Sequence, residues 1–105
     1  MAKTMYTIQM DFQKAKNQAD KLERIAKDLN NVANNDMSGC MRDVSANWKG
    51  ENAKVYVNKG YVVAENLRSA AAGLNQAAAT VRTIAQNTYN AEKRALELAK
   101  QRKYK

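Results

Sequence analysis

A repeat of apolar and small residues in the second half of the chain constrains the fold more than any other feature. Between residues 53 and 98 these side chains recur at alternating steps of three and four. The run comprises Ala53, Tyr56, Gly60, Val63, Leu67, Ala70, Leu74, Ala77, Val81, Ile84, Thr88, Ala91, Ala95 and Leu98. A spacing of about 3.5 residues places them on one stripe of an α-helix. The pattern predicts a long helix over residues 51–100 that packs against other helices through this stripe.

A shorter repeat of the same kind lies in the first half. It comprises Ala15, Ala19, Leu22, Ala26, Leu29 and Ala33, and resumes after a shift as Met37, Cys40, Val44 and Trp48. The shift coincides with "NNDMSG", residues 34–39, whose residue types are unfavourable in helix interiors. We therefore expect a first helix over residues 12–46 with a bend at this stretch. Asp11 is a candidate N-cap, preceded by an extended segment in which Tyr6, Ile8, Met10 and Phe12 alternate with polar residues.

The two repeats predict an all-α fold, a helical hairpin in a single domain over residues 1–105, with a turn at 47–50. The chain contains no proline and only four glycines, which suits long helices. We assign the largest apolar residues to a seam that joins the helices of the hairpin or of a dimer. The seam residues are Leu22, Leu29, Tyr56, Val63, Leu67, Leu74, Val81, Ile84 and Leu98.

The hairpin predicted in this way is incomplete. The second helix would be about 75 Å long and the first about 53 Å, so the end of the second helix has no partner within the chain. Two antiparallel helices also leave one side of each stripe in water. Both problems disappear if two hairpins pack into a four-helix bundle. A two-fold homodimer is the simplest arrangement, and a related second protein would serve equally well.

The only tryptophan stands at the predicted turn, within "ANWKGENAKVY", residues 46–56. Trp48 can close the end of the bundle, with its ring over the last core layer and its N–H on a loop carbonyl. Alternatively, Trp48 and Gly50 form a recognition surface at the turn. Gly50 would in either case permit a left-handed backbone as the first helix ends.

Trp48, Lys49 and Gly50, placed centrally between two amphipathic helices, resemble the WXG100 family of ESAT-6-like proteins. Ala53 and Tyr56 are similar to the small and aromatic residues that often follow that motif. The resemblance covers essentially the whole chain. It implies a helical hairpin that dimerises into a four-helix bundle. It also implies export by a type VII (ESX-like) secretion system of Gram-positive bacteria, through that system's ATPase and without a cleaved signal peptide.

The resemblance further implies a C-terminal Tyr-x-x-x-Asp/Glu motif that lies beside the Trp-x-Gly turn of the partner chain. This chain departs from that pattern, because Tyr89 is followed by Glu92 at the third position and by Lys93 at the fourth. Tyr104 has almost no chain after it. We interpret Tyr89 and Glu92 as a degenerate motif, or the export signal as one that a partner supplies. The basic tail (Lys100, Arg102 and Lys103) could pair with an acidic partner, or is a solvated helix end favoured by the helix dipole.

The composition argues against an enzyme, a cofactor site and a metal site. The chain has no histidine, and its single cysteine has no neighbouring base. Cys40 stands apart from other ligands, Asp36 and Asp43 are seven residues apart, and the glycines are isolated. We expect Cys40 to be a small buried group, although a cross-link between two chains remains an alternative. No apolar run indicates a signal peptide or membrane insertion.

Three functional hypotheses follow. The first is an exported homodimeric interaction protein, made in the cytoplasm and secreted, that binds no small-molecule substrate. The second is a targeting partner that binds the helical N-terminal region of a larger LXG-type effector. The third is a nucleic-acid-binding protein, suggested only by the net charge of +8. The lysines and arginines of the first helix alternate with acidic residues, which argues against the third hypothesis.

Overall fold

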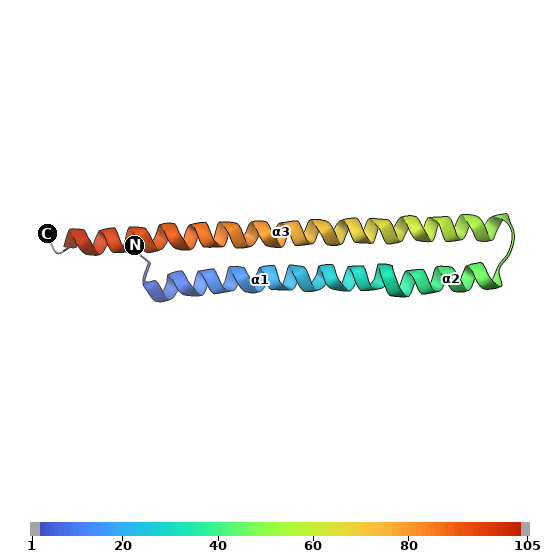
Figure 1. Cartoon of the computed structure of the whole chain (residues 1–105). Coiled ribbons are helices and arrows are strands. Elements are labelled where there is room, and N and C mark those ends of the chain that lie inside the picture. The colour runs from blue at the N-terminus through green and yellow to red at the C-terminus, as the bar shows by residue number, and fades with distance from the viewer. Residues whose placement is uncertain (1–2, 104–105) are drawn as a thin grey trace. The chain divides into compact units, whose positions relative to one another are not determined.

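The structure describes residues 3–103, and nearly all of this part of the chain is helical, as Figure 1 shows. The computed structural model contains α1 (Met5–Asn31), a π-helical turn (Val32–Met37), α2 (Ser38–Asn47) and α3 (Glu51–Lys103). The all-α prediction is confirmed. The chain divides into two compact units. We call residues 22–75 the turn unit and residues 1–21 with 76–105 the terminal unit.

The first helix begins earlier than the sequence pattern predicts. Thr4 caps α1: its side-chain Oγ1 accepts a hydrogen bond from the Thr7 N–H at 3.2 Å, and its carbonyl accepts one from the Ile8 N–H at 3.0 Å. The expected extended segment and the Asp11 N-cap are therefore wrong, because threonine already satisfies the free N–H groups of the first turn. The earlier start also extends the pairing in the terminal unit, where Ile8 lines a pocket together with Leu96 of α3.

A π-helical turn lies where the sequence predicts a bend. It spans Val32–Met37, and the Ser38 hydroxyl donates to the Ala33 carbonyl at 3.2 Å. A π-turn adds one residue to an α-helix, so the side chains that follow it are displaced by one position in the repeat. Met41 is accordingly buried and Cys40 is exposed. The expectation of a buried Cys40 is wrong for this reason.

The turn unit is an antiparallel hairpin of helices that meet through small residues. Ala26, Ala33 and Met41 are buried on one side, and Ala53, Gly60, Ala64 and Ala71 on the other. Gly60 is packed against Met41, because a Cβ at position 60 would lie 2.7 Å from the Met41 Cε. The predicted seam residues Leu22, Leu29, Leu67 and Leu74 are half-buried beside this layer.

The terminal unit pairs the start of α1 with the second half of α3. Ile8, Ala19, Ala78 and Ala85 are buried, and the seam residue Val81 is half-buried. The rings of Phe12 and Tyr89 lie 4.9 Å apart between their centroids, with an interplanar angle of 35°.

On α3, the seam within the chain differs from the predicted one at every second position of the repeat. Tyr56, Val63, Ile84 and Leu98 were assigned to the seam, but their side chains are about half exposed. In the first three cases the side chain at the next position, Val57, Ala64 or Ala85, packs between the helices instead. Alanine and glycine let the two backbones approach closely, so the helices turn this smaller face toward each other. The larger apolar side chains are left on an adjacent face.

Candidate functional site

Three residues, Trp48 to Gly50, connect α2 to α3. The Trp48 N–H still donates to the Val44 carbonyl at 2.8 Å, but its backbone is extended, with φ −110° and ψ 137°. Gly50 has φ +112°, and its carbonyl accepts a hydrogen bond from the Lys54 N–H at 3.3 Å, which opens α3. Residues with a side chain rarely adopt such a φ. The reversal of the chain therefore depends on glycine at this position.

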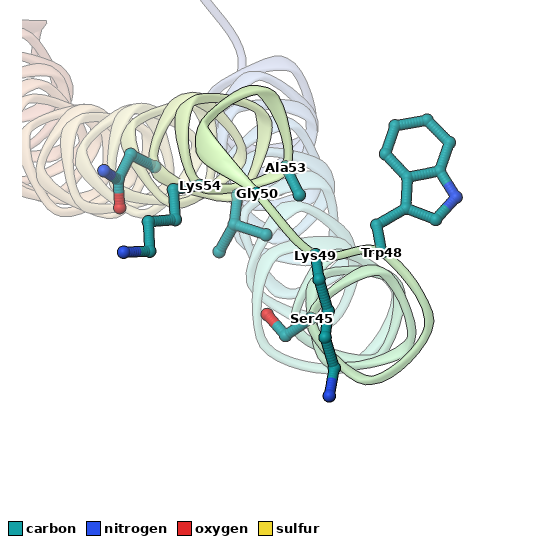
Figure 2. A pocket seen from close by; sticks show the side chains of 8 residues that line it. Ser45, Trp48, Lys49, Gly50, Ala53 and Lys54 are labelled. Atoms are coloured by element: carbon teal, nitrogen blue, oxygen red, sulfur yellow. The ribbon is translucent and has the colours of Figure 1, made fainter.

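Trp48 extends into solvent. Its side chain is 59% exposed, and its ring lies 6.0 Å from the ring of Tyr56 between centroids, tilted by 46°. Figure 2 shows the Trp48 ring directed away from Lys54, and Lys49 leaving the connection in another direction. Residues of the connection and of the first turns of α3 line a surface pocket of about 470 Å³. Trp48 therefore does not cover a core layer within the chain.

Four exposed apolar side chains continue from Trp48 along the turn unit. Ile25, Val32, Tyr56 and Val63 are 39% to 49% exposed. Each immediately precedes a residue that packs between the helices, namely Ala26, Ala33, Val57 or Ala64. In two antiparallel helices such positions lie on the same side of the pair. We call these four residues and Trp48 the turn-unit face. Several large exposed apolar side chains on one side of a helix pair indicate an interaction site.

Cys40 borders the turn-unit face. It immediately precedes the buried Met41, just as the residues of that face precede residues that pack between the helices. Its thiol is free and exposed.

Tyr89 and Glu92 both contact other residues of the terminal unit. Tyr89 is half-buried against Phe12, and a Glu92 carboxylate oxygen accepts a hydrogen bond from the Lys3 Nζ at 3.2 Å. Lys3 also donates to Asp11 at 3.0 Å. Two hydrogen bonds raise the pKa of the Lys3 ammonium: the one to Asp11 has the larger effect and the one to Glu92 the smaller. The second oxygen of Glu92, Oε2, is buried without a hydrogen-bond partner within the described residues.

The residues of the basic tail continue α3. Lys100 and Arg102 lie on the helix, exposed, and α3 ends at Lys103. The side chain of Lys103, and Tyr104 and Lys105, lie outside the described part of the chain.

The positive charge of the chain is concentrated in one unit. The terminal unit has eleven lysines and arginines against four acidic residues, a net charge of +7, whereas the turn unit has seven against six, a net +1.

Two arginines pair across the helices: Arg82 with Asp20, and Arg68 with Asn34 at 2.7 Å.

Sequence reasoning missed the contacts of Lys3, Phe12 and Asp11. Lys3 and Phe12 lie close to one end of the chain, and their partners Glu92 and Tyr89 lie more than 75 positions away, whereas Asp11 pairs with Lys3, eight positions before it. The signal that could have found them is the glutamate at a seam position, one heptad after Ala85, since a partly buried carboxylate requires a cationic partner.

No protein-family model matches this chain, and no curated protein or solved structure matches it at a significant level. Across residues 3–103, no helix combines the length and hydrophobicity needed to cross a bilayer.

Proposed function

We propose that this chain is a non-enzymatic, ESAT-6-like (WXG100) protein, exported by a type VII secretion system, that acts as a dimeric helical interaction module. The observation that carries the proposal is the exposure of Trp48 at the connection between two long helices. The largest side chain of the protein would contribute more to stability if it were buried. Its position in solvent, beside a glycine that sets the turn, favours recognition by another protein.

The dimer in this proposal forms through the turn-unit face. This face is apolar, and the turn unit has a net charge of only +1, so two copies can approach without strong repulsion. A second copy would cover Tyr56 and Val63 and complete a four-helix bundle. Trp48 would then lie at the margin of the dimer, where the secretion ATPase or a partner could contact it.

The role of a targeting partner for a larger LXG-type effector is the second candidate. It is favoured by the state of Tyr89 and Glu92, which are held by Phe12 and Lys3. A motif that is engaged within its own chain is not free to serve as an export signal. In this version the effector supplies the signal, and this chain supplies the helices that complete the bundle.

Substitution of Trp48 tests the proposal. In a Gram-positive host with an intact type VII system, we expect the chain in the culture medium, and we expect none when the secretion ATPase is deleted. Trp48→Ala should reduce the secreted amount at least about tenfold, because it removes an exposed aromatic anchor of the kind that dominates recognition. Its helicity and solution mass should stay unchanged.

The matched control is Tyr61→Ala, which removes another exposed aromatic side chain outside the turn-unit face. This variant should be secreted like the wild type. Secretion of Trp48→Ala at the wild-type level, or secretion that does not require the ATPase, would contradict the proposal. Secretion only when an effector is co-expressed would favour the targeting role.

A further inference from the structure

The terminal unit has an exposed apolar stripe that differs in its surroundings from the turn-unit face. Ile84, Ala91 and Leu98 follow one another at intervals of seven on α3, and the two large side chains are 58% and 53% exposed. Beside Ile84, a groove of about 250 Å³ runs between α1 and α3. Its apolar lining includes Phe12, Val81 and Tyr89.

The stripe continues where α3 has lost its helical partner. From Glu97 to Arg102 every side chain is exposed, although α3 remains helical. In Figure 1 this red end of α3 continues past the blue start of α1. A helix that exposes Leu98 beyond its own pairing partner can accept a second helix alongside.

Basic side chains border the stripe. Arg94 lies three residues after Ala91 and four before Leu98, and Arg102 lies four after Leu98, so both are neighbours of the stripe on the helix surface. On α1, the exposed Lys14 lies one turn after Asp11, which lines the groove. We call Ile84, Ala91 and Leu98, with Lys14, Arg94 and Arg102, the terminal-unit face.

We propose that the terminal-unit face binds an amphipathic helix of a partner protein, one whose apolar stripe is flanked by aspartate and glutamate. The apolar stripe and groove match the apolar side of such a helix, and the basic borders match its acidic flanks. Paired charges beside an apolar seam are the usual determinant of partner choice between helices. This inference concerns a different surface from Trp48 and does not rest on the proposed export function.

A second copy of this chain is a poor occupant of the face. Neither unit is net negative, and a second copy would bring another charge of +8 to a unit that already has +7. Like charges brought together in this way select against a partner.

Phosphate surfaces match the face less well than an acidic helix does. Glu97 precedes Leu98 on α3, and Asp11 and Glu92, which both pair with Lys3, line the groove. A continuous row of phosphates on nucleic acid or on an anionic bilayer would meet these carboxylates. A helix presents separate carboxylates that can lie beside Arg94 and Arg102 and avoid Asp11 and Glu97.

The test uses the full chain and a fluorescent synthetic peptide of about four heptads, with leucine at positions a and d and glutamate at e and g. Binding is measured by anisotropy at physiological ionic strength. We expect the wild-type chain to bind this peptide. We expect no measurable binding of the same peptide with lysine in place of glutamate. The double variant Lys14→Glu/Arg94→Glu should bind at least about tenfold more weakly. Leu98→Ser should also weaken binding several-fold, because it removes the apolar contact.

The matched control is Lys54→Glu/Lys59→Glu, which changes the net charge by the same amount in the turn unit. It should change the affinity less than about threefold, because distant exposed charges are screened. Equal weakening by both double variants would overturn the proposal, as would unchanged binding by Leu98→Ser or no binding by the wild type. Tighter binding to a DNA duplex or to phosphatidylglycerol vesicles, insensitive to Leu98→Ser, would also overturn it and assign the face to phosphates.

Discussion

Trp48 and Gly50 have different roles in the connection between α2 and α3. Gly50 supplies a backbone conformation, φ +112°, and nothing lies within 4 Å of the position that a Cβ would occupy. Trp48 supplies a side chain that the hairpin leaves exposed. One residue of the motif is therefore required by the fold, whereas the other is available for recognition, and substitutions at the two positions should have separable effects.

Gly50→Ala should destabilise the chain by about 1 to 3 kcal/mol, because an alanine would be strained at this φ. Gly73→Ala is the matched control: Gly73 is exposed within α3, has no contact that would obstruct a Cβ, and has an ordinary helical backbone. It should stabilise the chain by about 0.5 to 1 kcal/mol through helix propensity. Urea unfolding followed by circular dichroism measures both. Equal effects of the same sign would show that Gly50 is not required by the turn.

At the scale of the elements, the π-helical turn keeps one apolar stripe in the seam across an extra residue. Ala33 near its start and Met41 after it are both buried, eight residues apart. In an uninterrupted repeat of 3.5 the corresponding separation is about seven residues. The turn therefore absorbs one residue without rotating α2 away from α3.

We expect the protein to tolerate the deletion of one residue within the π-turn. Removal of Asn35, an exposed residue of the π-turn, should convert the turn to α-helix and leave Met41 in the seam, with stability changed by less than about 1 kcal/mol. Removal of Asn17, an exposed residue of α1, should rotate the preceding part of the helix by about 100°. Ile8 and Phe12 would leave the seam, at a cost of at least about 3 kcal/mol.

Thermal unfolding of the two deletion variants distinguishes these outcomes. A deletion of Asn35 that destabilises the protein as much as the deletion of Asn17 would mean that the π-turn has its own structural role and does not simply accommodate one residue.

At the scale of the whole molecule, the protein has a thin core. Eight of the ten apolar side chains that are buried within residues 3–103 are alanines, and many large apolar side chains remain exposed. Alanine contributes little hydrophobic free energy, since the burial of each CH₂ group adds about 0.8 kcal/mol. The isolated chain therefore forms close helix contacts but leaves much of its apolar surface for association.

We expect light scattering across a dilution series to give a mass twice that of the chain, as the homodimer requires. Val63→Glu, which introduces a charge into the turn-unit face, should shift the protein to the mass of one chain, because the carboxylate would be buried without a partner. Val62→Glu is the matched control, since Val62 is also an exposed valine but lies about 100° away around α3. A mass of one chain for the wild type at every concentration would contradict the homodimer.

Helix periodicity is local information, and the features that depend on it could be predicted before any contact was known. The apolar repeats predicted two long helical stretches, and "NNDMSG" predicted the irregularity at the π-turn. The same pattern predicted that α3 begins near residue 51. The candidate site was recognised from Trp48 and Gly50 because a single tryptophan and a glycine are conspicuous between helical repeats, but the sequence left open whether the tryptophan is buried or exposed.

The remaining features depend on which surfaces approach each other. Tyr56 and Val57, or Val63 and Ala64, are neighbouring apolar candidates for the seam, and the repeat does not choose between them. The choice follows from the close approach that Gly60 and the alanines allow, which brings the smaller face inward and leaves Tyr56 and Val63 outside. The pairing of Lys3 with Glu92 joins residues 89 positions apart. Such a contact follows from the pairing of α1 with α3 in space, and no local pattern contains it.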